Sequence, residues 1–129
     1  MITGGSQGLG LAIAHELLQR GDCEVTLIAR RMEALIEAKQ SLKSNQVWLL
    51  AADVTDQEAI AEVIERAHHR RPISWVFCCA GAAKPGLFLE QDLKDHQQGW
   101  QLNYQGTVNT LQPALRLMIR DRVEDPRVI

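Results

Sequence analysis

The sequence contains few cysteines, no long apolar run and no large excess of charge of either sign. Its three cysteines, two of them adjacent at Cys78 and Cys79, fit neither a disulfide framework nor the ligand spacing of a zinc site. We therefore expect free thiols and no metal site. Apolar runs such as WVFCCA at 75–80 fall far short of the roughly 20 residues that a membrane helix needs, so any membrane anchor would belong to segments outside these residues. A formal net charge of −2 gives no general attraction to nucleic acid.

What the sequence does contain is an alternation of short apolar runs with amphipathic stretches over one domain, residues 1–129. The continuous apolar runs are typical of strands covered on both faces. We expect strands at 25–29, 47–51 and 73–80, a further apolar run from 127, and helices at 9–20, 32–43, 56–69 and 93–121. Thr55 and Glu58 are placed as a capping box at the start of the third helix. The pattern predicts an α/β fold: a Rossmann-type, doubly wound parallel sheet with helices on both faces and about five strands present.

A glycine-rich turn, TGGSQGLG at 3–10, joins the end of the first strand to the first helix. Gly4 can adopt a positive φ, Gly8 lets the backbone approach a pyrophosphate, and Gly10 lets the helix pack closely on the strand. Exposed N–H groups at the positive end of the helix would hold the anion. A tight turn without a ligand would also explain the glycines, but the strand-turn-helix context favours a dinucleotide.

Arg30 and Arg31 follow the second strand, about twenty residues after Gly10. An acidic residue at this place would bind the ribose hydroxyls of NAD. An arginine can instead bind a 2′-phosphate through paired donors, so the predicted cofactor is NADP(H). The alternative is a solvated arginine at the start of a surface helix.

Four features in order along the chain resemble the short-chain dehydrogenase/reductase family. They are the turn Thr3-Gly4-x-x-x-Gly8-x-Gly10, the pair Asp53-Val54, the run Cys78-Cys79-Ala80-Gly81, and Asn103 in the following helix. The resemblance covers essentially the whole chain. It implies that Ser6 and Leu9 help to hold the phosphates. It also implies that Asp53 binds the adenine amino group while Val54 flanks the ring.

At the nicotinamide end the resemblance implies that Ala80 and Gly81 lie against the ribose. Asn103 is the one member of the family's catalytic set that can be placed, where its backbone kinks the helix and holds a water. The family's usual motif at 78–81 is Asn-Asn-Ala-Gly, so Cys78 and Cys79 replace two asparagines. This departure puts a side-chain hydrogen bond in doubt, but not the turn.

Reduction in this family resembles general acid catalysis by a tyrosine, with a lysine four residues later and a serine nearby. The one tyrosine here is Tyr104, Val108 follows it by four residues, and no lysine comes after Lys94. Tyr104 and Trp100 are therefore expected to pack rather than to react. We expect the sequence to be the cofactor half of a longer enzyme, starting inside the first strand, ending as the fifth begins, and inactive by itself.

Within the family, CCAGAAKPGLFLEQ and LNYQGTVNTLQPAL resemble the 3-ketodihydrosphingosine reductases, especially fungal ones. That likeness implies NADPH-dependent reduction of a lipid-like ketone at the cytosolic face of the endoplasmic reticulum, with this piece alone being cytoplasmic. It also leaves a homodimer possible through the helix from 103 to 121. The apolar loop at 84–89 would line the mouth of a lipid site or pack over the sheet edge. The alternatives are a short-chain enzyme for another ketone or alcohol, and a non-catalytic dinucleotide-binding module.

Overall fold

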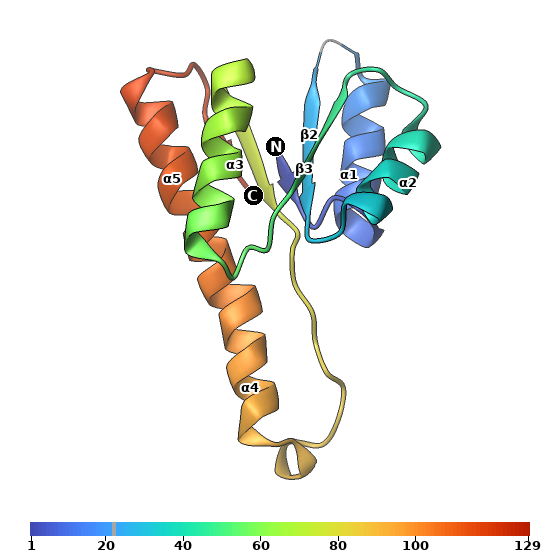
Figure 1. Cartoon of the computed structure of the whole chain (residues 1–129), viewed down its shortest axis with the longest axis vertical. Coiled ribbons are helices and arrows are strands. Elements are labelled where there is room, and N and C mark those ends of the chain that lie inside the picture. The colour runs from blue at the N-terminus through green and yellow to red at the C-terminus, as the bar shows by residue number, and fades with distance from the viewer. Residues whose placement is uncertain (22) are drawn as a thin grey trace.

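The computed structural model describes residues 1–21 and 23–129, which form a five-stranded parallel sheet with helices on both faces (Figure 1). The strands lie in the order β3-β2-β1-β4-β5. They are β1 (Ile2–Thr3), β2 (Val25–Ala29), β3 (Val47–Ala51), β4 (Trp75–Cys78) and β5 (Arg127–Val128). Because β1 pairs with both β2 and β4, the sheet extends in both directions from the first strand. The predicted doubly wound α/β fold is confirmed.

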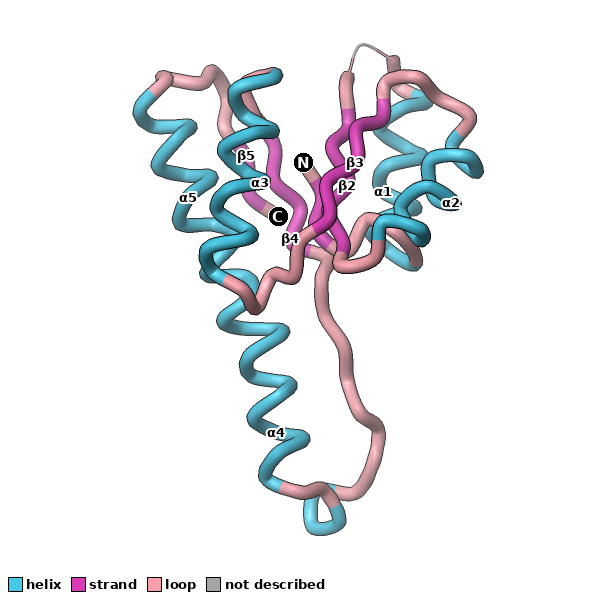
Figure 2. The backbone as a smooth tube through the Cα atoms, viewed as in Figure 1, coloured by secondary structure: helices cyan, strands magenta, loops and turns pink. Residues whose placement is uncertain are grey.

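Two layers of helices cover the sheet. The helices are α1 (Gly8–Gln19), α2 (Met32–Leu42), α3 (Gln57–Arg70), the 3₁₀ turn η1 (Phe88–Glu90), α4 (Leu93–Gly99), the π-helical turn η2 (Trp100–Gln105) and α5 (Gly106–Arg120). Figure 2 shows α1 and α2 on one side of the strands and α3 and α5 on the other. The strand order reverses between β1 and β4, which is where ligands of such sheets bind. In the part of the chain that the structure describes, no helix is both long and apolar enough to cross a bilayer.

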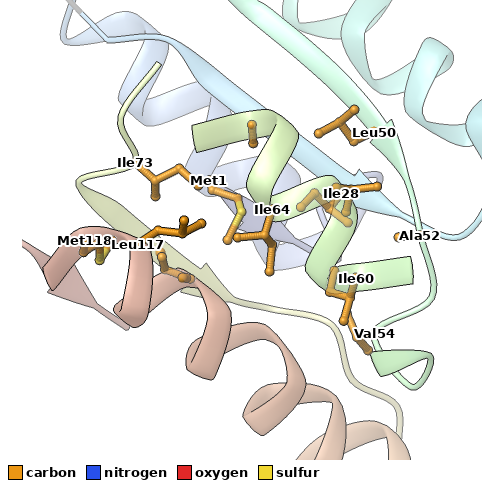
Figure 3. Packing of buried hydrophobic residues seen from close by; sticks show 14 residues of the cluster. Met1, Ile28, Leu50, Ala52, Val54, Ile60, Ile64, Ile73, Leu117 and Met118 are labelled. Carbon is orange, nitrogen blue, oxygen red and sulfur yellow. The ribbon is translucent and has the colours of Figure 1, made fainter. Parts of the chain in front are cut away.

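The strands alternate their side chains between the two layers, and each layer holds a cluster of buried apolar residues. Leu27 packs with α1 and α2, whereas its neighbour Ile28 joins the cluster under α3 and α5 (Figure 3). Both side chains are fully buried. A strand covered on both sides needs apolar residues at every position, which explains the continuous runs in the sequence.

The start of α3 differs from the predicted capping box. The Asp56 carboxylate, not Thr55, accepts the backbone N–H groups of Glu58 and Ala59, each at 3.1 Å. Thr55 instead donates its hydroxyl to Asp53 at 2.8 Å. The prediction was wrong because a carboxylate one residue later caps the positive helix end, and Asp53 engages the threonine hydroxyl.

The last helical region, predicted as one helix, is α4, η2 and α5 in succession. A π-helical turn within a longer helix is rare and often marks a functional site. The rings of Trp100 and Tyr104 stack with centroids 5.2 Å apart, and the two residues are 56% and 58% exposed. The two side chains therefore pack against each other, as expected, but on the surface of the molecule. Figure 1 shows the reason, since this part of the helix projects away from the sheet.

A buried histidine connects the far end of α3 to α5. The Nδ1 atom of His68 accepts the backbone N–H of Ile73 at 3.1 Å, so its ring proton lies on Nε2 and is donated to Asp121, at 2.9 Å. The Arg120 guanidinium, and then His68, hold the pKa of Asp121 below its ordinary value of 3.8. The two helices are thus joined by a polar link as well as by apolar contact.

Candidate cofactor site

A cleft of about 400 Å³ opens beyond the carboxyl ends of β1 to β4. The predicted cofactor residues that line it are Gly4, Ser6, Gly8, Leu9, Arg30, Arg31, Asp53, Val54, Ala80 and Gly81. Residues that the motifs missed also line it: Gln7, Ile28, Ala29, Ala34, Ala52, Cys79, Ala82 and Leu102. Most of these residues are adjacent in the sequence to a predicted residue. Extending the prediction to every residue at the carboxyl ends of the strands could therefore have found them.

The three glycines of the turn do different things. Gly4 has a φ of +66°, and a Cβ there would lie 2.6 Å from the carbonyl carbon and oxygen of Cys79. A Cβ on Gly10 would lie 2.5 Å from the Gly4 oxygen, so this glycine lets α1 pack closely on the turn after β1 rather than on the strand, and it does not line the cleft. Gly8 has a φ of +55°, and a Cβ there would meet no atom of the described chain within 4 Å. Gly8 therefore faces free space in the cleft.

The N-terminus of α1 opens into this cleft with its backbone donors free of side-chain caps. Gln7 occupies the N-cap position, and within the described residues neither a capping side chain nor an acidic residue in the first turn neutralises the helix end. The Gly5 N–H, donated to the Ile28 carbonyl at 3.2 Å, fixes the turn to β2. A rigid, positive helix end with free N–H groups can hold a phosphate.

Arg30 stands at the mouth of the cleft, directly after β2. Its side chain is 71% exposed, and Nη1 lies 3.9 Å from Oδ2 of Asp53, too far for a hydrogen bond. The other carboxylate oxygen of Asp53 accepts the backbone N–H of Thr55 at 2.9 Å and its hydroxyl at 2.8 Å. The guanidinium is therefore near a fixed carboxylate but free to bind another anion. Arg31 is the exposed N-cap residue of α2.

Asn103 holds the loop at the other end of the cleft. Its Oδ1 accepts the Ala82 N–H at 3.0 Å, and its Nδ2 donates to the Ala82 carbonyl at 2.9 Å. A Cβ on Gly81 would lie 3.0 Å from the same Oδ1. Asn103 lies in the π-helical turn, which agrees with the predicted irregularity of the helix. Its side chain positions the residues that line the cleft, whereas the water that it was predicted to hold remains a prediction.

Cys78 and Cys79 are free thiols, both partly buried. Burial, and then the neighbouring Cys79, raise the pKa of the Cys78 thiol to about 11, and burial also raises the pKa of Cys79. Thiols that stay protonated near neutral pH are poor nucleophiles and poor metal ligands. Across the described residues, no three His, Cys, Asp or Glu side chains gather as a metal site.

The apolar loop after Gly81 lies in the open. Leu87, Phe88 and Leu89 are 67%, 77% and 94% exposed, so they do not pack over the sheet edge. An ion pair of 2.7 Å between Lys84 and Asp95 closes the loop onto α4.

Comparison with known proteins places this architecture in a family. The short chain dehydrogenase model matches residues 1–125. A PIGF/3-ketodihydrosphingosine reductase fusion protein of Schizosaccharomyces pombe is 36% identical over 92% of this chain and 24% of its own length. The 3-ketodihydrosphingosine reductase ksrA of Aspergillus fumigatus is 33% identical over 90% and 34%, and the 3-ketodihydrosphingosine reductase of Mus musculus is 31% identical over 95% and 39%. The chain thus spans well under half of the length of these relatives.

Solved structures agree with the fold. Serine dehydrogenase from Escherichia coli matches with a TM-score of 0.87 at 23% identity, over 98% of this chain and 58% of that one. An alcohol dehydrogenase from the archaeon Thermococcus sibiricus, complexed with 5-hydroxy-NADP, matches with a TM-score of 0.82 at 26% identity, over 92% and 52%. With its glycine turn, its cleft at the reversal of strand order and a family match along nearly its whole length, the chain belongs to the short-chain dehydrogenase family.

Proposed function

We propose that this chain binds NADP(H) in the cleft, with the pyrophosphate on the N-terminus of α1 and the 2′-phosphate at Arg30. The observation that carries the proposal is the exposed guanidinium of Arg30 at the mouth of a cleft whose Gly8 turn leaves free space at an uncapped helix end. Anions are stabilised at such a helix end, and a guanidinium fits a phosphate with two parallel donors.

The choice of NADP(H) over NAD(H) rests on the charge at the end of β2. Arg30 and Arg31 stand where an acidic side chain would bind two ribose hydroxyls. Asp53, the nearby acid, is engaged by Thr55 through one oxygen, and its other oxygen faces Arg30. Its carboxylate is available for the adenine amino group rather than for the ribose.

At the opposite end, Ala80 and Gly81 would lie against the nicotinamide ribose. Nicotinamide supplies or accepts a hydride when it is bound. The contribution of this chain is orientation, because the two hydrogen bonds between Asn103 and Ala82, one in each direction, fix the loop that forms this wall of the cleft. The small side chains of Ala80 and Gly81 leave room for the ribose.

The activity that we propose for the whole protein is reduction of the ketone of 3-ketodihydrosphingosine, at the cytosolic face of the endoplasmic reticulum. Three relatives at 31% to 36% identity carry that name, which supports the substrate class. These 129 residues alone are not expected to turn over a ketone. Tyr104 is stacked on Trp100 in the open, and Val108 stands where the partner lysine would be needed.

The placement of Tyr104 also favours a second candidate, a dinucleotide-binding module without catalysis. Titration of the chain with NADPH, followed by the fluorescence of the reduced nicotinamide, tests the binding that both candidates share. Addition of 3-ketodihydrosphingosine then tests turnover. Binding without NADPH oxidation is the expected result for these residues. A longer form that carries Tyr-x-x-x-Lys should oxidise NADPH with that ketone, and its failure to do so would favour the binding module.

A further inference from the structure

Asn109 of α5 reaches across to the turn that follows β3, although it lies 55 residues away in the sequence. Its side-chain Nδ2 donates to the carbonyl of Val54 at 3.0 Å, and the residue is 6% exposed. Gly106, one turn earlier on α5, makes this approach possible, because a Cβ there would lie 2.6 Å from Val54 Cγ2. The helix is thus fitted closely to Val54 at two points.

The turn that Asn109 holds is closed on itself and carries Asp53. The Asp53 carbonyl accepts the Asp56 N–H at 3.0 Å, and the Asp53 carboxylate accepts both donors of Thr55. A turn with this many internal bonds moves as a unit. Its outer attachments are therefore what fix the Asp53 carboxylate in the cleft. They include the Ala52 N–H, donated to the Ala29 carbonyl of β2 at 3.0 Å, the packing of Val54 against Gly106, and the hydrogen bond from Asn109.

We propose that Asn109 is a positioning residue for the adenosine end of the cofactor. Asn109 acts through the Val54 carbonyl. It holds Asp53 where the Asp53 carboxylate can accept a hydrogen bond from the adenine amino group. The inference rests on the proposed function, because it requires an adenine in this cleft. Asn109 itself is not among the residues that line the cleft.

The chemistry of the site explains why an amide serves here. The backbone donors within α5 are committed to the helix, so a side chain must supply the donor for the buried Val54 carbonyl. An aspartate of nearly the same size would place an oxygen against that oxygen. Repulsion would then displace the turn, and the carboxylate of Asp53 with it.

The test compares NADPH with its hypoxanthine analogue, which lacks the adenine amino group. The unchanged chain should bind NADPH about tenfold more tightly, the effect of one charge-assisted hydrogen bond. In Asn109→Asp and Asn109→Ala this preference should fall to about twofold or less. A smaller folded fraction alone would weaken the binding of both ligands equally and leave the ratio of their dissociation constants unchanged.

Thr110→Val is the matched control. Thr110 is the next residue of α5, is 1% exposed, and uses its hydroxyl within the helix, donating to the Gly106 carbonyl at 2.8 Å. The Thr110→Val substitution removes a buried hydroxyl that makes no hydrogen bond to the turn. This variant should keep the full preference for NADPH over the hypoxanthine analogue. A preference retained in both Asn109 variants, or lost equally in Thr110→Val, would overturn the inference. No binding of NADPH by the unchanged chain would overturn the proposed function and this inference together.

A measurement on the unchanged chain covers the case in which the Asn109 variants do not fold. Adenosine 2′,5′-bisphosphate is titrated into ¹⁵N-labelled protein, and the side-chain amide resonances of Asn109 are followed. We expect them to shift on saturation, because the amide and the ligand meet the same turn from opposite sides. Resonances that stay in place while those of Thr55 move would contradict the proposed link.

Discussion

Substitution of Gly8 by alanine separates the structural use of the glycine turn from its use in binding. Gly8 has a φ of +55°, and an alanine there costs about 1 kcal/mol of folding free energy for the left-handed conformation. No steric cost is added, because a Cβ would meet no atom of the described chain within 4 Å. In Gly4→Ala the same backbone cost is joined by a Cβ only 2.6 Å from the Cys79 carbonyl. The total should reach about 3 kcal/mol or more.

Stability should therefore distinguish the two variants from each other, and NADPH binding should distinguish Gly8→Ala from the unchanged chain. Urea denaturation should find Gly8→Ala close to the unchanged chain and Gly4→Ala far less stable. NADPH titration of the folded Gly8→Ala protein should show affinity weaker by about tenfold or more, since the methyl group occupies the space that we assign to the pyrophosphate. Binding by Gly8→Ala equal to that of the unchanged chain would refute the assignment. So would a stability loss as large as that of Gly4→Ala.

The remaining predictions concern the cofactor phosphate, an acid-sensitive ion pair and a buried thiol. Arg30→Ala should weaken NADPH binding by about tenfold and NADH binding much less, and calorimetric titration that finds equal losses would contradict the phosphate contact. Because its neighbours lower the pKa of Asp121, the stability it contributes is complete above 3.8 and is lost as the pH falls below that value. Asp121→Asn should therefore lose less stability than the unchanged chain as the pH falls from about 4 to about 2, as measured by urea denaturation. Because burial raises the pKa of Cys78 to about 11, its thiol stays protonated at pH 8. Iodoacetamide should leave Cys78 unmodified in the native chain and label it in urea, as read by mass spectrometry.

The strands could be predicted from the sequence because each is buried on both faces. The apolar runs at 25–29 and 47–51 coincide with β2 and β3, and β4 occupies the middle of the run at 73–80. The start of α3 could not be predicted as well. Thr55, Asp56 and Asp53 can all accept or donate hydrogen bonds, and which of them caps the helix depends on how the turn folds.

The candidate site likewise has a part that could be predicted from the sequence and a part that could not. Residues such as Gly8, Arg30 and Asp53 were predicted together because they follow parallel strands, and the carboxyl ends of parallel strands meet at one edge. The contacts of Asn103 and Asn109 could not be predicted in the same way. Their partners are backbone groups of distant segments, and an amide side chain in a helix does not reveal which carbonyl it will reach.

The central claim is that a phosphorylated dinucleotide binds between the uncapped end of α1 and the guanidinium of Arg30. The most direct measurement is the dissociation constant of the unchanged chain for NADPH and for NADH in the same low-salt buffer. We predict saturable binding of both, with NADPH tighter by about tenfold. An absence of NADPH binding by the folded chain, or equal affinity for the two dinucleotides, would contradict the claim.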